Sequence, residues 1–163
     1  MSMQLVVIAV GNDARGDDAL GPLLLDRVVK AGFPGVRAQL EFQLQVEHAL
    51  DISGAGLVLF IDAAHGLHTP YELSELEPAR ATPAFSHALA PAAVLAVLEQ
   101  LEGHAPPAFL LRVRGEQFGL GDSLSPLAEA ALPLAWELLA TLLSAPSLAA
   151  WRRLLRVQLP QPS

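Results

Sequence analysis

A twelve-residue stretch, GNDARGDDALGP at residues 11–22, follows directly on the apolar run QLVVIAV at residues 4–10. A continuous apolar run that ends at a glycine is typical of a buried strand in a parallel sheet. The stretch after it is then a loop, and its aspartates Asp13, Asp17 and Asp18 would repel phosphate. Its glycines fit neither a dinucleotide-binding motif nor a Walker A motif. The stretch therefore predicts an α/β fold with an acidic loop that does not hold phosphate.

Strand and helix patterns alternate along the rest of the chain. Strands are expected at 36–42, 57–61, 71–76 and 108–113, and helices at 19–31, 47–52, 91–101, 124–143 and 146–155. This alternation predicts one three-layer α/β domain, spanning 1–163, with a mostly parallel sheet. The pattern at 71–76 favours a half-exposed edge strand.

Local signals set the expected ends and irregularities of the helices. Asp17 or Asp18 is placed to cap the first helix, and a pure capping role would make Asp17→Asn almost harmless. The long helix at 124–143 is expected to bend near Pro133. The tail 157–163 is expected to be flexible.

Composition excludes several classes of protein. Hydrophobic residues make up 52% of the 163 and charged residues only 17%, which disfavours disorder. A net charge of −7, with Lys30 as the single lysine, argues against a nucleic-acid partner. The chain has no cysteine, which removes disulfides, thiolate metal sites and a cysteine nucleophile.

Neither apolar segment of the chain is expected to be a targeting or membrane segment. The apolar run near the amino end lacks the basic flank of a signal peptide. The apolar stretch at 131–151 is interrupted by Glu137, Pro133 and Pro146, so a buried helix is favoured over a membrane span. We expect a soluble, cytoplasmic protein with no membrane partner.

Three carboxylates follow strands that should end at the same edge of the sheet. Asp17 and Asp18 come after the first strand, and Asp62 comes at the end of the third. Either aspartate of the pair alone could be a helix cap, and Asp62 alone could be a turn residue. Together they repel one another unless a cation joins them, since only Arg15 is near in sequence. The sequence thus predicts a cation site.

Two histidines compete to be the third ligand. His87 lies in the loop before the helix that starts at Pro91, and His65 lies three residues after Asp62. Two carboxylates and one imidazole suit a divalent transition metal better than Mg²⁺. The spacing of these residues does not choose between the two histidines.

A bacterial receiver domain would also place an acidic pair after its first strand and a phosphorylated aspartate, here Asp62, after its third. Such a domain needs a lysine after its last core strand. Arg114 stands there instead, and Lys30 lies in the first helix. The receiver hypothesis is disfavoured.

Three blocks of the chain resemble, in this order, the signature blocks of the [NiFe]-hydrogenase maturation endopeptidases. They are VVIAVGNDARGDDALGP (6–22), LVLFIDAAHG (57–66) and SHALAPAAVLAVLEQL (86–101). The later stretch AFLLRVRGEQFGLGDSLSPLAEAAL (108–132) is similar to the closing strand, loop and helix of that family. The resemblance spans about residues 4–143. It implies a twisted five-stranded sheet flanked by helices, in a phosphorylase/hydrolase-like arrangement. It also implies removal of a C-terminal peptide from the large-subunit precursor of a [NiFe] hydrogenase once nickel is in place.

The resemblance also implies which residues act. Asp18, Asp62 and His87 match the family's nickel-recognition and catalytic positions, which selects His87 over His65 and leaves Asp17 and His65 as secondary candidates. Ala19 stands where the family often has glycine. The nickel is expected to come with the substrate instead of residing in the protease.

The chemistry is expected to be attack by a metal-supported water, because the chain has neither a G-x-S-x-G motif nor an H-E-x-x-H motif. Ser86, beside His87, is a conceivable nucleophile, but neighbouring residues rarely face each other productively. The competing hypothesis is a binding module that reads the metallocentre without cutting.

Overall fold

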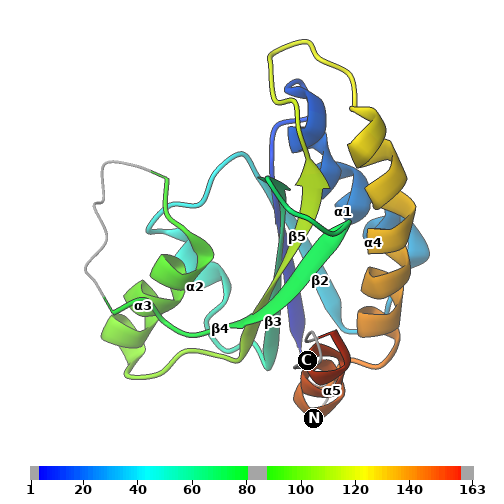
Figure 1. The fold of residues 1–163 in the computed structure, drawn as a ribbon. Helices are drawn as coiled ribbons and strands as arrows, with labels where there is room; N and C mark the ends of the chain where they lie inside the picture. Colours follow the sequence, from blue (N-terminus) through cyan, green and yellow to red (C-terminus); the bar gives the residue numbers. More distant parts are fainter. Residues whose placement is uncertain (1–3, 81–87, 159–163) are drawn as a thin grey trace, which may run out of the picture.

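The computed structural model describes residues 4–80 and 88–158, and its centre is a five-stranded sheet. The strands are ordered β2-β1-β3-β5-β4, and only β4 runs antiparallel to its neighbour (Figure 1). Their bounds are β1 (Leu5–Val10), β2 (Val36–Glu41), β3 (Leu57–His65), β4 (Tyr71–Leu76) and β5 (Ala108–Gly115). The predicted mostly parallel sheet is confirmed, and so is the edge position of β4.

Helices cover both faces of the sheet. One face carries α1 (Leu20–Ala31), α4 (Pro126–Ser144) and α5 (Leu148–Gln158), and the other carries α2 (His48–Asp51) and α3 (Pro91–Glu102) (Figure 1). A short 3₁₀ helix, η1 (Gly16–Ala19), precedes α1 at the carboxyl ends of the parallel strands. The three-layer architecture is confirmed.

Alternation along the strands divides the core in two. In β3, Leu59 and Ile61 point toward α1 and α4, whereas Val58 and Phe60 point toward α2 and α3. All four side chains are fully buried. Beyond Ile61 the same alternation directs the next side chain, that of Asp62, toward the α2 and α3 face.

Helix α4 is long and apolar enough to cross a membrane by length and composition alone. In the fold it packs on the sheet, and its buried side chains belong to the core. They are Ala128, Ala131, Ala135, Leu138, Leu139, Leu142 and Leu143. It therefore fits a core helix, as the sequence predicts, and it runs through Pro133 as one helix.

The structure corrects three boundaries. Strand β3 extends to His65, so Asp62 lies inside a strand and not at its end. Helix α5 continues to Gln158, so the first residues of the predicted flexible tail are helical. Helix α1 has Ala19 at its N-cap with no side-chain hydrogen bond, so the prediction that Asp17 or Asp18 caps it is wrong.

Candidate active site

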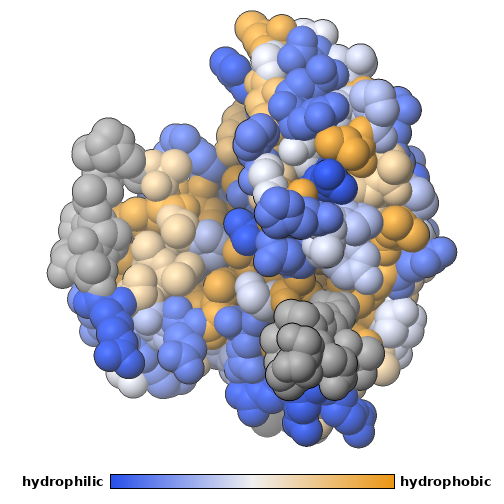
Figure 2. Space-filling view, in the orientation of Figure 1, coloured by the Kyte–Doolittle hydropathy of each residue, from blue (hydrophilic) through white to orange (hydrophobic). Residues whose placement is uncertain are grey.

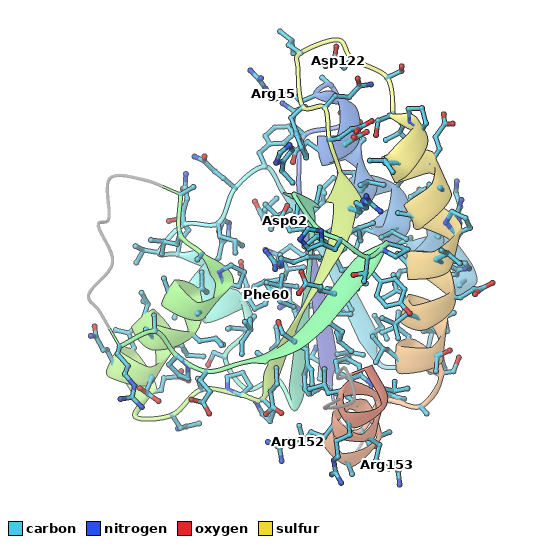
Figure 3. All side chains as sticks on the ribbon, in the orientation of Figure 1. Arg15, Phe60, Asp62, Asp122, Arg152 and Arg153 are labelled. Carbon is cyan, nitrogen blue, oxygen red and sulfur yellow. The ribbon has the colours of Figure 1, made fainter. Side chains whose placement is uncertain are left out.

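Asp18 and Asp62 come from different elements and lie together at the carboxyl edge of the sheet. Asp18 belongs to η1, which follows β1 and packs against β3, and Asp62 lies in β3 itself. Figure 3 shows Asp62 beyond Phe60, toward the loops that carry Arg15 and Asp122. Arg15 is exposed at the tip of its loop, so the structure brings the two predicted carboxylates together without it.

Gly21 allows this close approach. A Cβ on Gly21 would lie 2.7 Å from the carbonyl oxygen of Val10 and 3.4 Å from that of Ile61. Glycine is the residue that lets a helix pack this closely on strand backbones. The start of α1, and with it Asp18, is thereby held against the residue that precedes Asp62.

The two carboxylates interact electrostatically. Burial raises the pKa of Asp62, and the negative charge of Asp18 raises it further, to about 7. The backbone N–H of Ala63 and the guanidinium of Arg112 oppose this rise without cancelling it. A cation beside the pair would favour the ionised form of Asp62, because it would offset both the burial and the repulsion.

Asp18 is oriented by the loop that precedes it. Its Oδ2 accepts a hydrogen bond of 2.7 Å from the backbone N–H of Asn12. The Asn12 side chain in turn accepts one from the N–H of Ala14, which tightens the loop. Among the described residues no partner occupies the other oxygen of Asp18, Oδ1, which leaves that atom available to a ligand.

Asp17 has a different surrounding from its neighbour. It is fully buried, and its carboxylate accepts hydrogen bonds from the backbone N–H groups of Glu116, Gln117 and Ser125 and from the Ser125 hydroxyl, at 2.6–3.0 Å. Burial alone would raise the pKa of Asp17, but these hydrogen bonds outweigh it and hold the pKa below its ordinary value. Asp17 therefore fastens the loop between β5 and α4, and it has no free oxygen for a cation.

Arg112 and Glu72 flank the acidic pair, although no motif in the sequence marks them as residues of the site. Arg112 of β5 pairs in register with Asp62 on one side and with Glu72 of β4 on the other. Its guanidinium donates to Glu72 at 2.9 Å. The signal in the sequence is a charged residue inside the apolar run AFLLRV. This row extends the site toward the edge of the sheet.

The structure separates His65 from the acidic pair. His65 is three residues beyond Asp62 in the same strand, so its side chain points to the opposite face of the sheet. It is exposed and lines a groove beside β4. His87 lies outside the described residues.

A second group of potential metal ligands lies between β2 and α2, where Glu41, His48 and Asp51 place ligand atoms within 4.8 Å of one another. The Nδ1 of His48 accepts a hydrogen bond of 2.8 Å from the N–H of Gln45, so the proton of the neutral ring sits on Nε2. Nε2 faces Glu41 at 3.2 Å. It has no lone pair to give a metal, so this group is a hydrogen-bonded link between β2 and α2.

The fold is similar to that of known proteins of solved structure. No family model and no curated protein matches the sequence. Among solved structures, HycI, a [NiFe] hydrogenase maturation protease from Thermococcus kodakarensis, matches with a TM-score of 0.65 and 24% identity, over 88% of this chain and 94% of that one. The hydrogenase maturating endopeptidase HybD from E. coli matches with a TM-score of 0.66 and 22% identity, over 88% and 94%. This chain has the fold of the [NiFe]-hydrogenase maturation proteases.

The likeness to the maturation proteases extends over most of this chain. A hydrogenase 2 maturation peptidase from a Thaumarchaeota archaeon covers 86% of this chain and 97% of its own, with a TM-score of 0.61 and 22% identity. Such coverage exceeds any single strand-helix-strand unit. The fold that the sequence blocks imply is thereby confirmed.

Proposed function

We propose that the protein is a cytoplasmic endopeptidase that removes the C-terminal extension of a [NiFe]-hydrogenase large-subunit precursor after nickel insertion. The observation that carries this proposal is the pairing of Asp18 with Asp62 at the carboxyl edge of a fold shared with maturation proteases. The sequence blocks around both aspartates support it, because they resemble the signature blocks of that family.

The proposed ligand of the acidic pair is the nickel of the substrate. A bound cation would relieve the repulsion between the two carboxylates and so stabilise their ionised forms. Asp18 also has an oxygen without a hydrogen-bond partner among the described residues. Asp17 takes no part, because its carboxylate is already fully hydrogen-bonded. Precursor without nickel would then bring no counter-charge and would be rejected.

His87 is proposed as the third ligand. It precedes α3, which covers the face of the sheet toward which Asp62 points. A neutral imidazole beside two carboxylates gives a donor set suited to a divalent transition metal. Three protein ligands leave room for ligands that the precursor already provides.

We propose that water, supported by this metal, attacks the scissile carbonyl. The chain has no cysteine to act as nucleophile. Asp18, Asp62 and His87 would together hold the cation, and a carboxylate of the acidic pair is the base at hand to take up the proton of the attacking water.

The test is to incubate the purified protein with nickel-loaded precursor and measure the intact mass of the large subunit. Wild type should yield a shortened subunit, whereas Asp18→Asn and His87→Gln should bind the precursor weakly and leave it whole. Tight binding of loaded precursor without any shortening would favour the non-proteolytic binding module. Wild-type rates in both variants would refute the assigned site.

A further inference from the structure

A groove of about 1380 Å³ is lined by β4, which is an edge strand of the sheet, by the turn before it and by α4 and α5. Helices α4 and α5 form its apolar wall through Leu134, Leu138, Leu154 and Leu155. Strand β4 itself lines the groove, and in Figure 1 this strand lies at the front of the sheet. Figure 2 shows polar and apolar residues interspersed over the same region.

The backbone of β4 presents hydrogen-bonding groups to this groove. The N–H of Arg114 donates to the carbonyl oxygen of Pro70 at 2.9 Å, which fixes the alternation of the antiparallel pair. It follows that Tyr71, Leu73 and Glu75 direct their N–H and C=O groups away from β5. Within the described part of the chain, no hydrogen bond reaches the outward groups of Leu73 and Glu75.

The carbonyl group of Tyr71, the first of β4 to point away from β5, has a hydrogen-bond partner. The hydroxyl of Thr69 donates to the carbonyl oxygen of Tyr71 at 2.8 Å. Beyond that point an added strand is the partner that matches alternating N–H and C=O groups.

We propose that β4 receives an extended segment of the precursor, which adds to the sheet as a sixth strand. This inference rests on the proposed function. The segment should alternate apolar residues, which face α4 and α5, with basic residues. The basic residues would face the other side of β4, where Glu72 lies, whereas Glu75 and Glu137 lie on the side of α4 and α5. The lining as a whole is acidic, because it holds these three carboxylates and the single guanidinium of Arg112.

Charge favours this occupant over a second copy of the chain. Pairing β4 with β4 would bring Glu72 and Glu75 of two copies together, in molecules that each carry a net charge of −7. Glu72 and Glu75 are bound to Arg112 and Arg152 within the molecule, but these pairs are partly exposed to solvent and screen only part of the charge. An incoming segment with basic residues meets no such repulsion.

Two residues of the groove lining, Glu72 and Arg112, belong to the cross-strand row that leads to Asp62. The cross-strand row from Asp62 through Arg112 to Glu72 spans two strand spacings, and an added strand makes three. Three spacings are about 14 Å, which an extended chain crosses in about four or five residues. The segment held on β4 should therefore lie about that far from the bond cut at Asp62.

Amide hydrogen exchange on the intact protein tests the docking site directly. The probe is the capped peptide Lys-Val-Lys-Val-Lys-Val-Lys. We expect it to slow exchange of the Leu73 and Glu75 amides at least tenfold and to leave the opposite edge strand, β2, unchanged.

Two N-methylated forms of the probe are the controls, one methylated on every lysine and one on every valine. Successive backbone N–H groups of a strand point to opposite sides, so either the lysine N–H groups or the valine N–H groups face β4. The form methylated on the N–H groups that face β4 should lose binding, and the other form should keep it. The proposal would be overturned if the peptide left the exchange of the β4 amides unchanged, or if the two methylated forms bound equally well.

Processing of precursor tests the functional consequence. Leu134 is 43% exposed on the groove wall, and Leu101 is 63% exposed on α3, away from the groove. We expect Leu134→Lys to raise KM for nickel-loaded precursor at least tenfold at unchanged kcat, with Leu101→Lys unchanged. If wild type processes precursor and Leu134→Lys keeps the wild-type KM, the groove proposal fails and the proposed function stands. If wild type cuts no loaded precursor, the proposed function fails, and the exchange experiment still decides the groove.

Discussion

Asp17 and Asp18 are neighbours in the chain, but their carboxylates meet different surroundings. Asp17 is fully buried and accepts four hydrogen bonds from the loop before α4, whereas Asp18 accepts one and, among the described residues, keeps its other oxygen without a partner. This answers why the loop needs both. One carboxylate fastens the loops around the site, and the other remains available to a cation.

Substitution of Asp17 should destabilise the protein strongly. Asn in place of Asp17 keeps the shape but offers an NH₂ group where N–H donors already point. We expect Asp17→Asn to lose on the order of 3 kcal/mol of unfolding free energy at pH 7, measured by urea denaturation. Because the pKa of Asp17 is lowered in the fold, wild type should lose this contribution as the pH falls through the folded-state pKa.

The control for Asp17 is Ser125→Ala, which removes one donor and the cap of α4 but leaves the carboxylate three backbone partners. It should cost about 1 kcal/mol. A loss below about 1 kcal/mol in Asp17→Asn itself would show that the ionised carboxylate is not needed to hold the loop before α4.

Asp62 should show the opposite effect of charge on stability. Its pKa rises from an ordinary 3.8 to about 7 in the fold, so the folded protein retains a proton that the unfolded chain releases. The unfolding free energy must then fall as pH rises from about 4 to about 7. Asp62→Asn removes this penalty, so above pH 7 it should be more stable than wild type by on the order of 2–4 kcal/mol.

Thermal unfolding from pH 4 to pH 8 checks this expectation. The curves of wild type and Asp62→Asn should converge near pH 4 and separate as the pH rises. Parallel curves would mean that Asp62 titrates normally and is not repelled by Asp18.

At the scale of elements, the pattern of the sequence predicts every strand and α-helix that the structure describes, but not the 3₁₀ helix η1. Apolar runs such as LVLFI identify buried strands because both faces of a parallel sheet are covered. Boundaries were less predictable. Strand β3 continues to His65 because its last residues pair with β5, and that pairing leaves no apolar pattern in β3 itself.

Only part of the candidate site could be predicted from the sequence. The order of strands placed Asp18 and Asp62 at one edge, since carboxyl ends of parallel strands meet there. The burial of Asp17 was not readable, because its partners Glu116, Gln117 and Ser125 are about a hundred residues away. Nor was the position of Arg112, which depends on the register between β3 and β5.

The close contact of α1 with the sheet depends on the absence of a side chain at Gly21. Gly21 has a helical backbone that alanine adopts freely, so any loss in Gly21→Ala reports the contact of its Cβ with the Val10 carbonyl. We expect a loss of about 1–3 kcal/mol in unfolding free energy, together with slower processing as α1 shifts. Leu23→Ala, at a residue of the same helix that is 38% exposed, should lose less than about 1 kcal/mol. Equal stability of Gly21→Ala and wild type would show that the helix has room to move.

At the scale of the whole molecule, the two faces of the sheet differ: one is mainly apolar, and the other carries the charged residues of the candidate site. Helices α1, α4 and α5 cover one face with a continuous apolar core. The other face is apolar under α2 and α3 and becomes charged along the row from Asp62 through Arg112 to Glu72. The acidic pair lies at the inner end of this row, and the open edge of β4 lies at its outer end.

The central claim is that Asp18 and Asp62 read nickel carried by the substrate. The most direct measurement compares nickel-loaded and nickel-free precursor, each with wild-type protein and a chelator that removes only free metal, by the fraction of large subunit shortened. The account predicts cleavage of loaded precursor alone, and none when Asp18→Asn replaces wild type. Efficient cleavage of nickel-free precursor in the chelator would contradict it.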